Sequence, residues 1–353
     1  MRIPKILALV CCAAALSTAA GINMTAGKVE LKSAGALAMG PDGILLVGDS
    51  VGGKIVALDV DDAASKSSSS SVEIKGINEK IAAMLGTTAD QILIQDIAVS
   101  PISHSVYLAV SRGRGADAAA VILRATAAGK LSEVSLANIK NQAVSLTDQP
   151  QQDRQRMETI TQLKYVAGKV YVAGLSNEEF SSSLRAIPFP FNAADKGAGI
   201  EIWHGSHGRF ETNAPVRTFV PYEINGEKAI LAAYTCTPLV RIPVSELKPG
   251  NKVKGTTIAE LGAGNKPLDM IVYSKEGKNY ILMANSRRGV MKLTGDHLES
   301  FKPITTHTEV TGVPYETIAN LKGVQQLDKF DDSKAIVLMG EGASLDLVTV
   351  PLP

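Results

Sequence analysis

The chain is poor in aromatic residues and nearly neutral, and both shortages exclude classes of function. Phe, Trp and Tyr make up 5% of the 353 residues, and Trp occurs once. A platform that stacks successive nucleic-acid bases needs more aromatic side chains than this. Lys and Arg number 36 against 35 Asp and Glu, which gives a formal net charge of +1. This balance provides no electrostatic reason to bind nucleic acid or a membrane surface.

Cysteine is also scarce, and two of the three cysteines lie within the first 12 residues. That segment has two early positive charges, an apolar run at Ile6–Ala15 and small residues at Ser17–Ala20. This order of features predicts a secretory signal peptide over residues 1–20, followed by a single domain over residues 21–353. We therefore expect a periplasmic or secreted protein. Cys236 is then the one cysteine left, so we expect no internal disulfide.

Long apolar runs are missing as well. The run in the signal peptide covers about ten residues, whereas a helix that crosses a bilayer needs about 20. No other stretch is apolar and long enough, so we expect no membrane span.

A recurring unit predicts the fold. Each copy has an apolar strand, a turn containing Gly or Pro, a second apolar strand, a polar break and a third strand; the clearest copy is Pro267–Leu293. Six copies begin 52 to 65 residues apart, near Ala36, Asp96, Thr161, Arg217, Asp269 and Val324. Sheet-forming units at this period predict an all-β, six-bladed β-propeller. Seven blades are the alternative, with the extra unit in Leu131–Met157 or Gly295–Tyr315.

The extra length in each unit predicts short insertions at the rim. Asn78–Leu85 has a cap residue, an apolar face and a terminal Gly, which favour a short helix. Asn177–Leu184 follows a capping-box spacing and predicts a helical turn. Gly27–Leu31 has no blade of its own, and we expect it to pair with the last unit and close the ring.

Two hairpins carry a resemblance to a known superfamily. Gly40–Val47 and Ser100–Leu108 resemble the first hairpins of blades in NHL- and YVTN-type β-propellers. The strings SNEEFSSSLRAIPFPF and ELGAGNKPLDMIVY are similar to a group of exported bacterial propellers. The superfamily includes binding proteins, scaffolds, lactonases and lyases, so the resemblance implies a fold and not an activity.

The lactonase branch can be compared residue by residue. Its members resemble one another in placing a Glu, two Asn and an Asp around a divalent metal in the central channel. The corresponding positions here lie near Asp96, Thr161, Arg217 and Asp269. Thr and Arg depart from an all-oxygen calcium cage. Asp96 and Asp269 remain as alternative metal ligands, with Ca²⁺ as the ion.

The loops of a propeller are sorted between its two faces. The connections before strand A and between strands B and C lie on the ligand-binding face. His204 and His207 precede strand A of the fourth unit, and Cys236 follows strand B of the same unit. Two imidazoles and a thiol on one face suit Zn or Cu. The alternative is structural: loop histidines that bond backbone, and a small buried cysteine.

Five arginines share this face: Arg112, Arg114, Arg217, Arg287 and Arg288. Guanidinium groups suit carboxylate or phosphate, which predicts a small anionic ligand. The alternative is that these are solvated loop charges. No Ser-His-Asp order, nucleotide-binding glycine motif or zinc-protease helix occurs in the chain.

These features predict an exported binding or scaffold module that holds a small anionic ligand or a partner protein at this face. A metal-dependent, lactonase-like hydrolase with a metal at the channel mouth is the alternative. No certain cofactor is expected, and a binding role is favoured over an enzymatic one.

Overall fold

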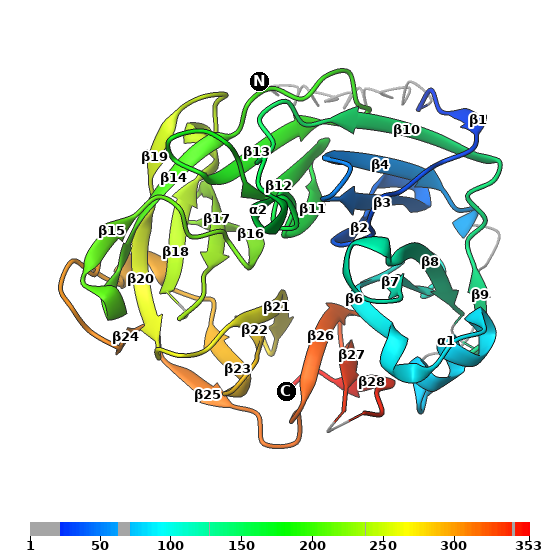
Figure 1. The fold of residues 1–353 in the computed structure, drawn as a ribbon. Helices are drawn as coiled ribbons and strands as arrows, with labels where there is room; N and C mark the ends of the chain where they lie inside the picture. The colour runs from blue at the N-terminus through cyan, green and yellow to red at the C-terminus, as the bar shows by residue number, and fades with distance from the viewer. Residues whose placement is uncertain (1–21, 63–70, 127, 237, 341–342) are drawn as a thin grey trace, which may run out of the picture.

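The computed structural model contains six sheets arranged around a central axis, and their strands pair antiparallel except for one parallel pair, β14 (Ala198–His204) with β19 (Lys252–Lys254) (Figure 1). It describes residues 22–62, 71–126, 128–236, 238–340 and 343–353. The predicted signal peptide, residues 1–20, lies outside the described residues. The chain is a six-bladed β-propeller, as the repeated unit predicted. We number the blades 1 to 6 in the order in which their first strands occur.

The first three blades use most of the N-terminal half. Blade 1 comprises β2 (Leu37–Met39), β3 (Ile44–Asp49), β4 (Lys54–Asp59), β10 (Ile139–Ser145) and β1 (Thr25–Gly27). Blade 2 comprises β6 (Ile92–Val99), β7 (Val106–Arg112), β8 (Ala119–Ala125) and β9 (Leu131–Glu133). Blade 3 comprises β11 (Gln162–Val166), β12 (Lys169–Leu175), β13 (Ser182–Pro188), β14 (Ala198–His204) and β15 (Arg209–Glu211), and β19 (Lys252–Lys254) pairs with β14.

The other three blades follow. Blade 4 comprises β16 (Thr218–Ile224), β17 (Glu227–Ala233), β18 (Pro238–Pro243), β20 (Thr256–Leu261) and β24 (Val310–Gly312). Blade 5 comprises β21 (Pro267–Lys275), β22 (Lys278–Asn285), β23 (Gly289–Thr294) and β25 (Tyr315–Thr317). Blade 6 comprises β26 (Val324–Lys329), β27 (Lys334–Met339), β28 (Asp346–Pro351) and β5 (Glu73–Ile74).

The seven-bladed alternative is wrong, and the outer strands explain why. Residues 131–157 contain β9 and β10, which complete blades 2 and 1. Residues 295–315 contain β24 and the start of β25, which complete blades 4 and 5. The segments that could have hidden another blade therefore supply edges to existing ones.

The first hairpins of blades 3, 4 and 5 are closed by the same kind of turn. The two turn residues both have positive φ at Ala167–Gly168, Asn225–Gly226 and Glu276–Gly277. The flanking strands pair directly across each turn. Two-residue loops with positive φ at both positions match the twist of the strands, and glycine adopts the second position without steric cost. These local sequences therefore specify the hairpins.

The order of blades around the ring differs from their order in the chain. Each of the six hydrophobic cores lies between two blades: 1 and 2, 2 and 6, 6 and 5, 5 and 4, 4 and 3, and 3 and 1. Blade 1 therefore lies between blades 2 and 3, and blade 2 adjoins blade 6 (Figure 1). The chain returns past blade 1 along β10 before it enters blade 3.

Closure of the ring uses a different strand from the one predicted. β5 pairs with β28, with Ile74 opposite Leu347. The predicted closing segment Gly27–Leu31 overlaps β1, which pairs with β10 at the outer edge of blade 1. The prediction was wrong because it assumed that blade 1 adjoins blade 6. Since blade 2 occupies that place, the segment leading into blade 2 closes the last blade.

Of the two helical segments predicted from the sequence, one forms and the other does not. α1 (Ile77–Leu85) forms, capped by Gly76 and Gly86, and packs into the core between blades 2 and 6. Asn177–Leu184 is not helical, because β13 begins at Ser182 and pairs there with Leu175 of β12. Sheet pairing has outweighed the local capping pattern.

The remaining helical pieces are short. They are α2 (Asp153–Arg156) and the 3-10 turns η1 (Pro41–Gly43), η3 (Ala89–Gln91), η4 (Gly115–Asp117), η5 (Gly205–His207), η6 (Val244–Glu246) and η7 (Leu298–Ser300). Within the described ranges, no helix has the length and apolar character needed to cross a membrane.

Candidate functional site

A cavity of about 620 Å³ lies where the innermost strands of the blades begin. Its lining comes from the starts of strand A and from the ends of strand B, which is the face predicted to bind ligands. Polar members include Ser50, Gln95, Glu158, Arg217 and Lys266. A space of this size is within the range of small-molecule sites. We call it the channel mouth.

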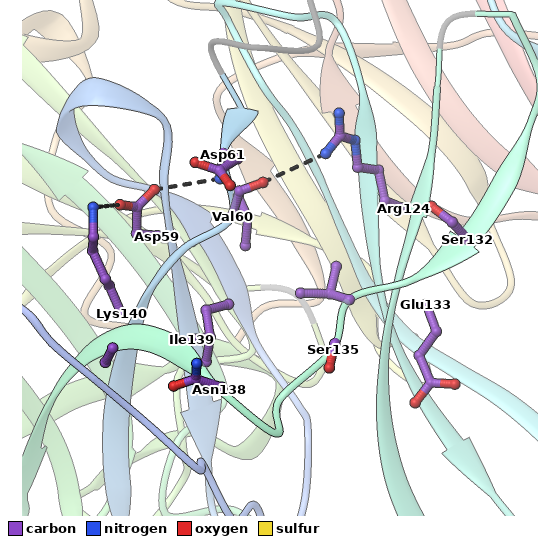
Figure 2. Close-up of a pocket in the computed structure, with 12 residues that line it drawn as sticks. Asp59, Val60, Asp61, Arg124, Ser132, Glu133, Ser135, Asn138, Ile139 and Lys140 are labelled. Carbon is purple, nitrogen blue, oxygen red and sulfur yellow. Dashed lines mark hydrogen bonds and ion pairs between the residues drawn. The ribbon is translucent and has the colours of Figure 1, made fainter.

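A second cavity, of about 520 Å³, lies on the outer rim between blades 1 and 2 (Figure 2). Its charged groups have both signs. Lys140 is 3.5 Å from Asp59, and Arg124 donates to the carbonyl of Val60 over 3.4 Å. None of the predicted site residues lines this cavity. It therefore does not belong to the predicted ligand-binding face.

Three aspartates on the innermost strands act as clamps between blades. Asp96 of blade 2 accepts a 2.7 Å hydrogen bond from the backbone amide of Leu37 in blade 1. Asp269 of blade 5 accepts one of 3.2 Å from Leu327 in blade 6. Each carboxylate also accepts from the amide of the residue that follows it.

Asp328 of blade 6 makes the third clamp. It accepts from the amide of Val99 in blade 2 over 2.8 Å. This bond joins two blades that are adjacent in the ring and far apart in the chain.

Lys164 of blade 3 provides positive charge to all three aspartates. Its cation acts to lower the pKa of Asp96, Asp269 and Asp328, while burial, the dominant cause, raises all three. The balance leaves the pKa of Asp269 at about 6. The same acids raise the pKa of Lys164 against the effect of its burial.

These contacts test the alternative prediction that Asp96 and Asp269 bind Ca²⁺. Calcium requires six to eight oxygen ligands. Here both oxygens of each carboxylate bind backbone amides, and a lysine supplies the compensating charge. These contacts favour a clamp between strands. Sequence reasoning missed Lys164 and Asp328, although both lie on first strands of the repeated unit.

The five arginines do not form one cluster. Arg217 lines the channel mouth, where its Nη1 is 2.6 Å from Glu158 and its Nε donates to Thr235. Arg112 and Arg114 turn outward and donate to the carbonyls of Leu85 and Asp90. They therefore brace the segment around α1.

Arg287 and Arg288 lie beside the loop that leads into β21. Arg288 donates to the carbonyl of Ala263, and a Cβ added at Gly262 would meet its guanidinium at 2.5 Å. Arg217 is thus the one member of the five that lines the cavity. Lys266, which the sequence analysis did not single out, lines it as well.

Loops from adjacent blades bring His204, His207 and Cys236 together. The sequence analysis had assigned all three to the fourth unit, and this was wrong for the histidines, because β14 and β15 are outer strands of blade 3. His204 ends β14 of blade 3, and His207 ends the turn η5 that follows. Cys236 lies between β17 and β18 of blade 4. One nitrogen of each ring and the sulfur lie within 4.8 Å of one another. Across the part of the chain that the structure describes, no other trio of His, Cys, Asp or Glu side chains forms such a group.

Glu211 orients both imidazoles. Its two carboxylate oxygens lie 2.7 Å from His204 Nδ1 and 2.7 Å from His207 Nδ1. The strands β14 and β15 pair, with Ile202 opposite Glu211 and His204 opposite Arg209, so the hairpin places Glu211 beneath both rings. The sequence analysis treated the segment after His204 as a loop and did not predict the β14–β15 hairpin, so Glu211 was assigned no role.

The charges in this cluster follow from its burial and hydrogen bonds. Although burial opposes ionisation, hydrogen bonds from the two histidines lower the pKa of Glu211 to about 2. Burial lowers the pKa of His204, and Glu211 only partly offsets this effect. The preferred state is therefore a carboxylate beside a neutral His204 ring, with the proton on Nδ1 and the lone pair on Nε2.

The loops that carry the cluster are themselves fixed. The amide of Gly205 donates to Glu260 Oε1 over 2.6 Å, and a Cβ at Gly205 would meet the Glu260 side chain at 2.8 Å. Only glycine fits this approach. Cys236 has a φ of +63°, and its amide donates to the carbonyl of Asn265 over 2.7 Å. A non-glycine residue in this region is held there by its surroundings.

Comparison with known proteins gives no family. No protein-family model matches the chain, and no curated protein matches its sequence. Many solved structures are similar in fold. The PQQ-bound aldose sugar dehydrogenase of Streptomyces coelicolor is 12% identical, with 92% of this chain and 96% of that chain covered and a TM-score of 0.36.

Two other solved structures are similar to a comparable degree. A gluconolactonase of Xanthomonas campestris is 11% identical, with 92% and 88% of the two chains covered and a TM-score of 0.35. The β-propeller domain of Swd1 (Cps50) from Myceliophteria thermophila is 9% identical, with 91% and 84% covered and a TM-score of 0.39. Likenesses this distant say nothing of activity, and the fold rests on the six sheets described above.

Proposed function

We propose that this chain is an exported β-propeller of the NHL/YVTN type that binds a small anionic ligand at the channel mouth. The observation that carries the proposal is the pair of cations in the cavity wall, Arg217 and Lys266, which share a single acid, Glu158.

The electrostatics of the wall favour an anion. Burial lowers the pKa of Lys266, and the charge of Arg217 lowers it further, while Glu158 acts in the opposite direction. Glu158 offsets one of the two cations. Asp96 is the other acid of the lining; burial raises its pKa, and Lys164 supplies it with a positive charge of its own. A positive charge therefore remains for a ligand to neutralise. A carboxylate or phosphate group suits this position, since Arg binds either through a planar pair of donors.

The cavity also has apolar surface for the rest of the ligand. Leu93 and Met157 line it, and these residues are 40% and 57% exposed. Large exposed hydrophobic groups beside polar ones are typical of ligand sites. The proposed ligand is therefore an organic anion with an apolar part. Export rests on the signal-peptide pattern of residues 1–20.

A second candidate function is metal-dependent hydrolysis of a lactone-like substrate. One observation favours it: the two histidines and the cysteine lie on the same face as the channel mouth, and Arg217 contacts Thr235, the neighbour of Cys236. Binding without turnover remains the first proposal, because the cavity and its cations need no metal.

A panel of carboxylates and phosphates, screened by thermal shift and followed by calorimetry, tests the binding proposal. At least one organic anion should bind, and more weakly as ionic strength rises. Arg217→Gln and Lys266→Gln should each weaken it about 10-fold or more, because a hydrogen bond to a charged group contributes about 1.5–3 kcal/mol. Lys169→Gln is the control, because Lys169 is exposed at the turn of the first hairpin of blade 3 and does not line the cavity. Equal affinity in all four proteins, or no binding by any anion, would contradict the proposal.

A further inference from the structure

We propose that His204, His207 and Cys236 bind one transition-metal ion that prefers nitrogen and thiolate ligands, Zn²⁺ or Cu⁺. This site goes beyond the anion site, since it uses different residues and does not depend on the organic ligand.

The donor atoms lie close enough together to bind one ion. The three candidate atoms lie within 4.8 Å of one another. Bonds of about 2.0 Å to nitrogen and about 2.3 Å to sulfur place tetrahedral ligands roughly 3.3–3.7 Å apart. The site therefore closes around an ion by side-chain shifts of about 1 Å. His207 is free to make such a shift, because its side chain is 42% exposed.

The orientation of the two imidazole rings also suits coordination. The centroids of His204 and His207 are 3.8 Å apart, and the ring planes are inclined by 33°. Both Nδ1 atoms bond to the same carboxylate, Glu211. Each ring therefore directs Nε2 away from Glu211. A carboxylate that binds the distal nitrogen of a metal-ligating histidine fixes its tautomer and orientation, and here one carboxylate does this for two rings.

A buried nitrogen of His204 favours coordination as well. His204 is 2% exposed, and its Nε2 has no hydrogen-bond partner among the described residues. Leaving a buried polar atom unpaired costs about 1–3 kcal/mol. If His204 only held two loops together through Nδ1, nothing would require its Nε2 to be buried without a hydrogen-bond partner. Coordination by Nε2 explains it.

The thiol of Cys236 lies beside the two rings. Hydrogen bonding within a loop explains Glu211 and the two histidines, but it does not require a sulfur beside them. Cys236 is held close to the rings by a backbone in the left-handed region, with its amide bonded to Asn265. A site prepared in this way loses little entropy when an ion binds.

The donor set selects the class of ion. Imidazole and thiolate suit Zn²⁺ and Cu⁺, whereas Ca²⁺ and Mg²⁺ prefer oxygen ligands. Three protein ligands leave one position of a tetrahedral zinc site open. Cu⁺ is satisfied by three ligands, so the same residues serve both ions.

Metal titration of the chelator-stripped protein under reducing conditions tests the proposal. Zn²⁺ and Cu⁺ are added separately, and Co²⁺ serves as a spectroscopic probe. The wild-type protein should bind one equivalent of Zn²⁺ or Cu⁺, and the Co²⁺ form should show thiolate-to-metal charge transfer. Binding of neither Zn²⁺ nor Cu⁺ would overturn the proposal.

Variants identify the ligands. Cys236→Ser should abolish the charge-transfer absorption and weaken binding at least 100-fold, and His207→Gln should weaken it similarly. Both residues are partly exposed, so the fold should persist, as circular dichroism can verify. His297→Asn removes an exposed imidazole elsewhere and is the matched control. Unchanged binding in Cys236→Ser and His207→Gln would place the metal at another site and overturn the assignment.

Glu211 is a positioning residue in this proposal. Glu211→Gln should keep the stoichiometry of one ion and the thiolate absorption, but weaken affinity about 10- to 100-fold, as expected for a partner of ligating histidines. Unchanged affinity in this variant would contradict the role of Glu211. These measurements use metal ions alone, so their outcome is independent of whether an organic anion binds at Arg217 and Lys266.

Discussion

Replacing Lys164 by Met removes the positive charge that Asp96, Asp269 and Asp328 share in the channel. In the wild-type protein, burial raises the pKa of Asp269 from its ordinary value of 3.8 to about 6, even though Lys164 lowers it. The native state therefore holds a proton between these pH values that the unfolded chain has released. Stability falls as the pH rises through this window.

In the Lys164→Met variant, the fall in stability with rising pH should continue to higher pH than in the wild-type protein. Without the lysine, the pKa of each aspartate rises further, and ionising them at pH 8 becomes more costly. A displacement of about two pH units corresponds to about 3 kcal/mol, and removing one partner of a buried ionic group costs about 3–5 kcal/mol. We expect Lys164→Met to lose about 3 kcal/mol at pH 8 and much less at pH 5, where the carboxyl groups can take up protons.

Urea unfolding at pH 5 and pH 8, followed by circular dichroism, measures this difference. Lys169→Met is the matched control, because Lys169 is exposed at the start of the neighbouring strand β12. An equal loss at both pH values would assign the effect to packing and refute the electrostatic reasoning. No loss at pH 8 would show that Lys164 does not neutralise the aspartates.

Three further changes test the ring by thermal unfolding. Asp148→Asn removes the partner of Arg185, 2.6 Å away in a pair with side chains 1% exposed, and should cost about 3–5 kcal/mol; an unchanged Tm would contradict this. Asn78→Ala removes two hydrogen bonds between α1 and blade 6 and should cost about 1–3 kcal/mol for each group left unsatisfied. A variant as stable as the wild-type protein would show that closure of the ring does not need these bonds. Gly174→Ala places a Cβ 2.0 Å from the carbonyl oxygen of Thr159 and should prevent normal folding; a native Tm would mean that the backbone moves aside.

The candidate site was partly accessible from sequence. The rule that loops before strand A and between strands B and C share a face depends only on the alternation of strands, so it brought His204, His207 and Cys236 to one place. The rule predicts on which face of the propeller a loop lies, but not in which direction its side chains point. It therefore grouped Arg112 and Arg114 with Arg217, although their side chains turn toward the carbonyls of Leu85 and Asp90.

Residues that complete the sites were less visible. Glu211 has no motif of its own, and it reaches the histidines because β14 and β15 form a hairpin. Lys164 meets its aspartates across the channel, from a different blade. The first contact needed a hairpin that no turn motif announced. The second depends on how separate blades are placed in space, and the spacing of residues within one unit contains no such information.

The sequence by itself determined the blades: apolar strands with glycine turns at Gly168, Gly226 and Gly277 specify hairpins, because the turn geometry and the apolar pattern are local. Only the tertiary structure decided the order of the blades around the ring. All six present similar apolar faces, so any two can form a core, and no local pattern states which pair will meet. The choice of blade 2 as the neighbour of blade 6 in turn made β5 the closing strand, through packing between segments more than 270 residues apart.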